Sequence, residues 1–287
     1  MARYAYVNGR YVDHRDASVH IEDRGYQLAD GVYEVVGVRD GRLIDEAPHI
    51  DRLDRSLREL RIGWPVSRQA LGFIMRELMR RNRLRDGLVY MQVTRGVARR
   101  DHAFPTTPVK PALVLTTKNT RHLGADPGPG VAVKSQPDIR WERCDIKTIA
   151  LLPNVLAKQA ARESGAYEAW LIDGKGNVTE GASTNAWIVT KAGELVTRAT
   201  DNAILAGITR HTLKVLAGDL QLKLVERSFT LAEAKDAKEA FITSATSFVT
   251  PVVRIDGDVV GDGKVGPTAR RLREEYVRFA ADGEAVT

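Results

Sequence analysis

The chain has 287 residues, of which 43% are apolar and 28% are charged, a composition typical of a folded globular protein. Its single cysteine, Cys144, excludes an intrachain disulfide and suits a reducing, cytoplasmic compartment. No apolar run is long enough to span a membrane, and the formal net charge of +6 is not accompanied by a motif for binding nucleic acid. We therefore expect a cytoplasmic protein that binds neither a membrane nor nucleic acid.

Strand and helix patterns alternate along the first 119 residues. Asn8 and Gly9 form a strong two-residue turn signal between two short strand-like segments, so a hairpin is expected at the N-terminus. Further along, apolar residues recur on one helical face at residues 50–60 and 67–81, which predicts two helices. Strand patterns cover residues 32–38, 43–44, 88–94 and 112–117.

A segment rich in proline and glycine, residues 120–130, lacks periodicity and is expected to be a linker. It separates an N-terminal α+β domain at residues 1–119 from a C-terminal domain at residues 131–287. The uneven mixture of elements predicts a two-lobed α+β fold, with a smaller N-terminal and a larger C-terminal lobe, rather than a parallel βαβ array. In the second half, strands are expected near residues 131–133, 167–172, 187–189, 222–225 and 240–243, and helices near 154–164, 207–220 and 267–281.

Lys147 is the first candidate catalytic residue. It lies in the largely apolar stretch of residues 145–152, where loss of hydration favours a neutral amine. A neutral amine can form an imine with an aldehyde and can move protons. The alternative interpretation is a lysine on the solvent-facing side of an edge strand. Lys158, in an expected helix, is a weaker candidate.

Three further segments contain residue types that suit ligand binding. Glu180 lies among small residues at 179–185, which predicts a loop where a carboxylate can approach a planar ligand closely. Gly207 opens an expected helix, whose first N–H groups form a natural phosphate site. Residues 243–247, Thr-Ser-Ala-Thr-Ser, offer hydroxyl and amide donors. Each segment can also be interpreted as an ordinary turn or helix cap.

Arg100 and His102 lie two residues apart on an expected loop, where both side chains can converge on a carboxylate. The alternative is a solvated cluster of charges. The glycine pattern at residues 261–266 resembles a dinucleotide-binding motif, but it is too close to the C-terminus and is expected to be a turn. The histidines show no zinc-like spacing, so no metal site is predicted, and Cys144 is expected to be a buried structural thiol.

Together these segments resemble the class IV, fold type IV aminotransferases over nearly the whole chain, and within that family its D-specific branch. Enzymes of this family depend on pyridoxal 5'-phosphate. The matching stretches are EDRGYQLADGVYEVV at 22–36, HIDRL at 49–53, VTRG at 93–96 with Arg100 and His102 after it, RCDIKT at 143–148, AKQ at 157–159, Glu180-Gly181 with Asn185, ILAGITR at 204–210, and TSATS at 243–247.

The resemblance implies a role for each matching residue. Lys147 would carry the cofactor covalently, and Glu180 would keep its pyridine nitrogen protonated. Tyr33, Arg100 and His102 would bind the substrate carboxylate, the last two from the partner subunit. Ala182 and Ala245 stand where hydroxyl residues are usual, which weakens the expectation of side-chain contacts there. The remaining cofactor-binding residues would be Arg52, Ile208, Thr209, Ser244 and Thr246 near the phosphate, Leu205 against the ring and Ser183 close to it.

The function implied is transfer of the amino group of a D-amino acid, such as D-alanine, to a 2-oxo acid, such as 2-oxoglutarate. A ping-pong mechanism and a homodimer with shared active sites are expected with it. Two enzymes of the same fold are alternatives, an L-branched-chain aminotransferase and an aminodeoxychorismate lyase. The pair of Arg100 with His102 argues against the first. A non-catalytic binding module is a third alternative, for which the combination of lysine, acid and phosphate-binding residues has little use.

Overall fold

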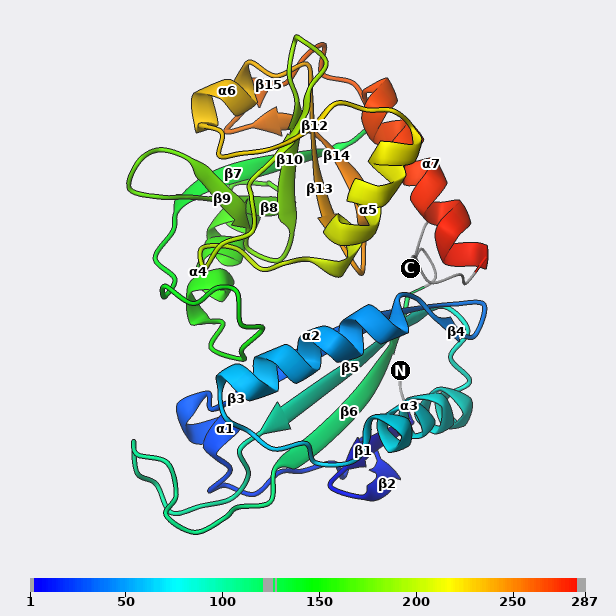
Figure 1. Cartoon of the computed structure of the whole chain (residues 1–287), viewed down its shortest axis with the longest axis vertical. Helices are drawn as coiled ribbons and strands as arrows, with labels where there is room; N and C mark the ends of the chain where they lie inside the picture. The colour runs from blue at the N-terminus through cyan, green and yellow to red at the C-terminus, as the bar shows by residue number, and fades with distance from the viewer. Residues whose placement is uncertain (1–2, 121–125, 127, 283–287) are drawn as a thin grey trace. The chain divides into compact units, whose positions relative to one another are not determined.

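The computed structural model describes residues 3–120, 126 and 128–282. These residues form two compact units. The first comprises the chain up to residue 120 together with Ile146–Ala150, and the second comprises the remainder. Each unit contains a β-sheet with helices, which confirms the α+β class (Figure 1). Most of the linker expected at residues 120–130 lies outside the described residues.

The first unit is built on an antiparallel sheet, in which six strands are described, in the order β2-β1-β6-β5-β3-β4. The hairpin expected at the N-terminus is confirmed, since Asn8 and Gly9 turn with φ values of 47° and 98°. The strands are β1 (Tyr4–Val7), β2 (Arg10–Asp13), β3 (Gly31–Arg39), β4 (Arg42–Leu43), β5 (Gly87–Thr94) and β6 (Ala112–Asn119).

Two helices pack on this sheet, α2 (Glu46–Glu59) and α3 (Arg68–Asn82), and a short helix, α1 (Arg24–Leu28), precedes β3. Both long helices were expected from their apolar periodicity. Ser67 caps α3 by accepting a hydrogen bond from the N–H of Ala70. The apolar faces of the helices and of the strands form one core, which includes Val32, Val36, Leu53, Leu57, Leu71, Met75, Leu78, Met91 and Leu115.

The second unit has a mixed sheet, in which nine strands are described. Its order is β12-β11-β10-β13-β14-β7-β8-β9, with β15 paired to β14. The pairs β7–β8, β7–β14 and β11–β12 are parallel and the others are antiparallel. The strands are β7 (Val131–Pro137), β8 (Glu168–Ile172), β9 (Val178–Gly181), β10 (Asn185–Val189), β11 (Leu195–Thr197), β12 (Leu224–Glu226), β13 (Glu239–Ser244), β14 (Phe248–Ile255) and β15 (Asp258–Val259).

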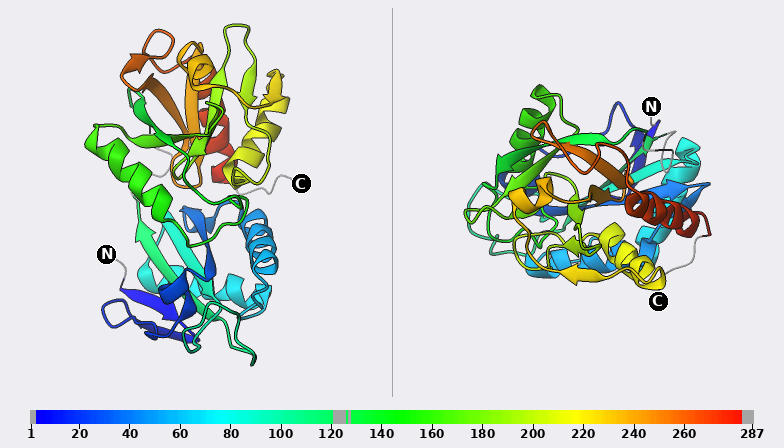
Figure 2. Two further views of the ribbon diagram at one scale, coloured as in Figure 1. Left: turned by 90° about the vertical axis from the view of Figure 1, so that its left-hand side faces the viewer. Right: turned by 90° about the horizontal axis from the view of Figure 1, so that it is seen from above.

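The helices of this unit are α4 (Leu152–Glu163), α5 (Ile208–Asp219), α6 (Leu231–Lys235) and α7 (Pro267–Asp282). Helices α5 and α7 lie side by side (Figure 2). Tyr276 of α7 packs on Phe248 at the start of β14, with ring centroids 4.8 Å apart. Within the described part of the chain, no helix is long and apolar enough to cross a membrane.

Gly31 begins β3 at a point where the backbone of β5 and the side chain of Ile149 approach closely. A Cβ atom at this position would lie 2.7 Å from the carbonyl oxygen of Val93 and 3.0 Å from Cδ1 of Ile149. Both distances are shorter than normal van der Waals contact, so any side chain would push β5 or Ile149 away.

We therefore predict that Gly31→Ala lowers the free energy of unfolding by about 1–3 kcal/mol, because the added methyl group overpacks the site. Urea denaturation measures the change. Gly63→Ala is the control, since a Cβ atom there meets nothing within 4 Å. Equal midpoints for both variants would show that the close approach at Gly31 does not constrain the fold.

Candidate active site

Lys147 is held by its backbone on the edge of β3 in the first unit. The N–H of Tyr33 donates to the carbonyl of Lys147 at 3.0 Å, and the N–H of Ile149 donates to the carbonyl of Gly31 at 3.1 Å. Thr148 adds a hydroxyl hydrogen bond to the same carbonyl of Gly31. The strand therefore fixes the backbone on both sides of Lys147, and its half-buried side chain starts from a defined point.

The structure brings Lys147 and Tyr33 together. The Nζ atom of Lys147 lies 4.2 Å from the centroid of the Tyr33 ring, a distance typical of a cation–π contact. The Tyr33 ring stacks on that of Tyr90, whose hydroxyl donates to Gln92 at 2.7 Å. Burial raises the pKa of Tyr90 to about 12, so this phenol stays neutral. Tyr33 thus contacts Lys147, one of the residues predicted to share its site, and its ring is held in place by Tyr90.

Arg52 is fixed by a buried carboxylate on β3. Glu34 accepts hydrogen bonds from Nε and Nη2 of Arg52 at 2.7 and 2.9 Å, and His49 contacts the same carboxylate at 2.8 Å. Arg52 and His49 are three residues apart on α2, so both face the strand. Burial opposes ionisation of Glu34, but its two partners outweigh burial and hold its pKa well below the usual range. The guanidinium therefore has a set orientation.

Arg100 and His102 lie on the loop after β5, where both are exposed. The loop itself is anchored. Arg24 donates to the carbonyl oxygen of Asp101, between the two residues, at 2.6 Å. Asp30 in turn holds Arg24 at 2.8 Å and Arg95 at 2.7 Å. Within the described residues the structure shows no contact of Arg100 or His102 with Lys147 or Tyr33.

Glu180 lies on β9 in the second unit, not in the loop that its small neighbours predicted. The sequence-based expectation was wrong because Thr179 to Gly181 pair with β8, and all residues of β9 are buried. Three donors reach the carboxylate. Arg140 Nη1 lies 2.5 Å from Oε1, Asn185 Nδ2 lies 3.0 Å from Oε2, and the N–H of Leu205 lies 3.2 Å from both oxygens. Burial raises the pKa of Glu180 to about 7, against the opposing effect of Arg140.

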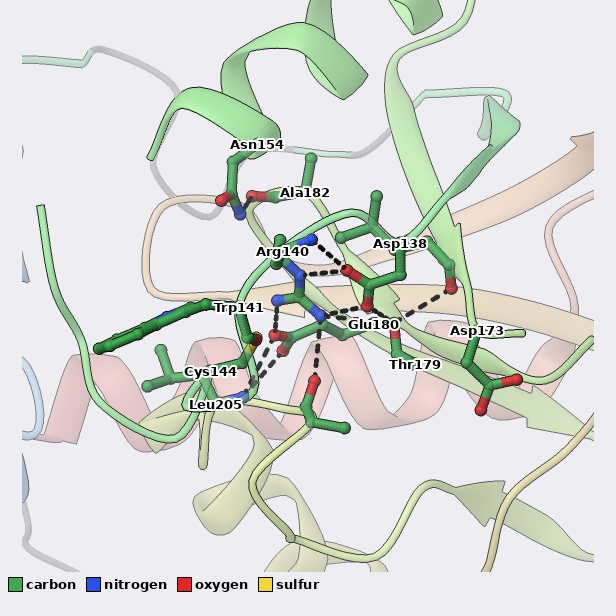
Figure 3. A network of polar contacts seen from close by, with 12 residues as sticks. Asp138, Arg140, Trp141, Cys144, Asn154, Asp173, Thr179, Glu180, Ala182 and Leu205 are labelled. Atoms are coloured by element: carbon green, nitrogen blue, oxygen red, sulfur yellow. Dashed lines mark hydrogen bonds and ion pairs between the residues drawn. The ribbon is translucent and has the colours of Figure 1, made fainter. Parts of the chain in front are cut away.

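Arg140 is the residue that sequence reasoning missed. Figure 3 shows its guanidinium between Asp138 and Glu180. The only sequence signal that could have pointed to Arg140 is the pattern Asp-x-Arg at 138–140. Such pairs are common on exposed loops, so the pattern is not specific. Here the side chain is only 7% exposed, which a single sequence does not reveal.

The start of α5 contains Ile208 and Thr209, preceded by Gly207 as N-cap. A Cβ atom on Gly207 would lie 2.0 Å from Oδ1 of Asn185, so only glycine fits. Thr209 is buried, and its hydroxyl oxygen lies 3.4 Å from the hydroxyl oxygen of Tyr276. The backbone N–H of Thr209 is therefore better suited than its hydroxyl to bind a phosphate. Leu205 lies just before this turn, and its backbone N–H donates to the carboxylate of Glu180.

Three hydroxyl groups of the predicted site occur in two different settings. The Ser183 hydroxyl donates to the buried carboxylate of Glu168 at 2.5 Å. Ser244 ends β13 and Thr246 lies in the turn that follows, with their hydroxyl oxygens 3.2 Å apart, and Thr246 is exposed. The turn therefore brings two of the predicted phosphate ligands together.

Cys144 is buried and its thiol donates to the carbonyl of Trp141 at 3.0 Å. Burial raises the pKa of this thiol to about 11, so the reactive thiolate is scarce at neutral pH. The expectation of a structural thiol is confirmed.

The chain belongs to the amino-transferase class IV family, whose model matches residues 31–255. It is therefore an enzyme, and an aminotransferase. It is 41% identical over 274 residues to a D-alanine aminotransferase of Staphylococcus haemolyticus, a match covering 96% of each chain. A D-alanine aminotransferase of Listeria monocytogenes is also 41% identical, over 94% of each chain.

Among solved structures, the fold resembles the branched-chain amino acid aminotransferase of Escherichia coli, with a TM-score of 0.89, 23% identity, and coverage of 99% of this chain and 97% of that one. A branched-chain aminotransferase of Thermoproteus uzoniensis, solved with norvaline, gives a TM-score of 0.84 and 26% identity, covering 98% of this chain and 95% of that one. These likenesses establish the fold type expected from the sequence.

We predict that Glu34→Gln lowers the free energy of unfolding at pH 7 by about 3–5 kcal/mol, because it leaves the largely buried Arg52 guanidinium without the Glu34 carboxylate. The folded-state pKa of Glu34 is depressed, so its contribution exists above the unfolded pKa of about 4.3 and is lost as the pH falls. Urea denaturation should therefore show a difference between the two proteins that shrinks below about pH 4.

The control is Glu59→Gln, at an exposed position on α2, the helix that carries Arg52 and His49, with an expected change within about 0.5 kcal/mol. A difference between Glu34→Gln and the unaltered protein that stays constant from pH 7 to pH 3 would contradict the ion-pair explanation.

Proposed function

We propose that this enzyme transfers the amino group of a D-amino acid, such as D-alanine, to a 2-oxo acid, such as 2-oxoglutarate, with pyridoxal 5'-phosphate as cofactor. The observation that carries the proposal is Glu180, a buried carboxylate whose three donors leave room for one more. A protonated pyridine nitrogen is such a donor. The relatives named D-alanine aminotransferase, at 41% identity, support the choice of substrate.

The residues fit this cofactor. Lys147 would hold it covalently, and Leu205 and Ser183 would lie near its ring. Arg52, oriented by Glu34, would bind its phosphate. The N–H groups of Ile208 and Thr209 at the start of α5 would do the same, together with the hydroxyls of Ser244 and Thr246. We propose accordingly that residues 131–287 form the cofactor-binding domain, apart from residues 146–150, which belong to the first unit, that residues 1–119 form the other domain, and that residues 120–130 link them.

When bound, the cofactor supplies an electron sink for the charge that forms when the α-proton leaves the amino acid. The protein's own residues do the rest. Lys147, once its amine is released and neutral, removes the α-proton and later returns a proton. Glu180, as a carboxylate, keeps a proton on the ring nitrogen, and Tyr33 borders the amine of Lys147. Ping-pong kinetics are expected, because the first 2-oxo acid would leave before the second binds at the same site, with the amino group retained on the enzyme in between.

Handedness depends on where the substrate carboxylate is held relative to Lys147. We propose that Arg100 and His102 of the partner subunit hold it in a homodimer, together with Tyr33. Their exposure in a single chain suits this role, because a residue that serves a partner must reach outward. An apolar stripe on α4 supports a second copy as partner, since Leu152, Val155 and Leu156 are each more than half exposed. The single buried thiol suits a cytoplasmic location.

The first test identifies the lysine that binds the cofactor. Borohydride reduction of the cofactor-loaded protein, followed by peptide mapping, should place the pyridoxyl group on Lys147. A label on Lys158 would refute the assignment.

A panel of D- and L-amino acids with 2-oxoglutarate should show preference for D-alanine. Faster turnover of L-leucine would favour the branched-chain alternative, and release of pyruvate from aminodeoxychorismate would favour the lyase.

We predict that Arg100→Ala lowers kcat/KM for D-alanine by roughly 30- to 1000-fold, because a guanidinium binds a carboxylate through two parallel hydrogen bonds. Amines without a carboxylate should lose little. Arg99→Ala, at the neighbouring exposed position, is the control. An unchanged preference for D- over L-alanine in Arg100→Ala would defeat the proposed carboxylate site.

The shared site has its own test. Mixing inactive Lys147→Ala chains with inactive Arg100→Ala chains should restore activity, because in a heterodimer one site receives both changes and the other neither. If both residues serve the site of their own chain, proven heterodimers stay inactive.

A further inference from the structure

Arg140 is part of a buried network that the reaction scheme above does not use. It lies on the loop after β7, and its Nη2 and Nε atoms bind the Asp138 carboxylate at 2.8 and 2.9 Å. Nη1 binds Glu180 at 2.5 Å, and Nη2 also donates to the carbonyl of Ala203 at 3.0 Å. The Thr179 hydroxyl, on the same strand as Glu180, donates to Asp138 at 2.7 Å. One guanidinium therefore joins two carboxylates (Figure 3).

The network carries one negative charge too many. Asp138, Arg140 and Glu180 are 11%, 7% and 6% exposed, so water screens none of them well. Two carboxylates and one guanidinium sum to −1. The other titratable groups nearby do not correct this. The Cys144 thiol is neutral, since burial raises its pKa to about 11, and Asp145 is paired with Arg143. An uncompensated buried charge is costly, which explains why burial raises the pKa of Glu180 to about 7.

The geometry also leaves a place for the missing cation. A carboxylate can accept about four hydrogen bonds. Glu180 receives three donors, and one of them, the N–H of Leu205, is shared between both oxygens at 3.2 Å. A cationic N–H group at this carboxylate would complete both the hydrogen bonding and the charge balance of the network.

We propose that Arg140 is a positioning residue that, together with Asp138, presents Glu180 as an oriented carboxylate with one unbalanced charge, and thereby sets the protonation of the cofactor's ring nitrogen. The inference rests on the proposed function. Arg140 acts through Glu180 and touches neither substrate nor cofactor. Removing the guanidinium leaves two carboxylates without a cation, so Glu180 takes up a proton. Removing the charge of Asp138 has the opposite effect, because Arg140 is then paired with Glu180 alone.

The test begins with the cofactor-free protein, labelled with ¹³C at the glutamate carboxyl carbon, with the Glu180 signal assigned by its loss in Glu180→Gln. In the unaltered protein we expect Glu180 to titrate with a midpoint of about 7. Arg140→Met should raise that midpoint, and Asp138→Asn should lower it, each by about 1–3 pH units. Arg140→Lys keeps the positive charge but lacks the planar guanidinium group. The Glu180 midpoint in this variant should lie between the midpoints of Arg140→Met and the unaltered protein.

Arg198→Met is the matched control, since Arg198 is also largely buried and also pairs with two aspartates, Asp173 and Asp201. Its Glu180 midpoint should not move. A merely structural role for Arg140 predicts shifts of the same sign in Arg140→Met and Asp138→Asn, or none, and either result overturns the proposal. If Arg140→Met does not fold, Asp138→Asn and Arg140→Lys still decide.

The second arm uses pyridoxal 5'-phosphate labelled with ¹⁵N at the ring, whose chemical shift reports protonation of that nitrogen at pH 7. It should be protonated in the unaltered protein and in Arg198→Met, and unprotonated in Arg140→Met. A protonated ring in Arg140→Met overturns the proposal. If the unaltered protein does not bind this cofactor, the proposed function fails instead, while the carboxyl titration still decides whether Arg140 controls Glu180.

Discussion

The ionisation of two buried glutamates, Glu34 and Glu180, depends on how far neighbouring groups offset the cost of burying their charge. Glu34 and Glu180 are both glutamates on strands, and both are almost completely buried. Glu34 binds Arg52 and His49, and its pKa falls well below the usual range. Glu180 shares the Arg140 guanidinium with Asp138, and burial raises its pKa to about 7. The same side chain is thus a permanent anion in one unit and a group able to gain or lose a proton in the other, because the partners outweigh burial at Glu34 but not at Glu180.

Backbone hydrogen bonds to β3 fix the position of the Lys147 main chain. Only residues 146–150 return to the first unit, while the chain before and after them belongs to the second. Ile146 packs into the core of the first unit, and Thr148 is also buried. The backbone of the segment in addition pairs with an existing strand. The N-terminal end of β3 provides it, since Gly31 and Tyr33 exchange hydrogen bonds with the backbone at Lys147 and Ile149. The Lys147 side chain is thereby attached to a sheet without being part of a regular strand.

Periodicity in the sequence was sufficient to predict α2, α3, α5 and α7, because each has a continuous apolar face against a sheet. It failed at β9, where Thr, Glu and Gly lie in a fully buried strand. Glutamate is tolerated there only because Arg140 and Asn185, distant in sequence, satisfy it. β14 was also missed, since Pro251 interrupts the strand pattern and proline cannot donate to a ladder. Lys147 and Glu180 were candidates from their sequence context and Arg52 from the resemblance to a family, whereas Arg140 was not a candidate, because its burial exists only in the folded chain.

Asn185 couples two regions that differ in chemical role. Its amide nitrogen binds both the carboxylate of Glu180 and the carbonyl of Leu205, at 3.0 and 2.9 Å, and its amide oxygen leaves no space for a side chain on Gly207. The end of β9 and the first turn of α5 are therefore joined through one planar group with little freedom to rotate. A displacement of the helix start cannot be absorbed locally, since it must lengthen a hydrogen bond to Glu180. The position of the first turn of α5 and the hydrogen bonding of the Glu180 carboxylate are consequently linked through a single side chain.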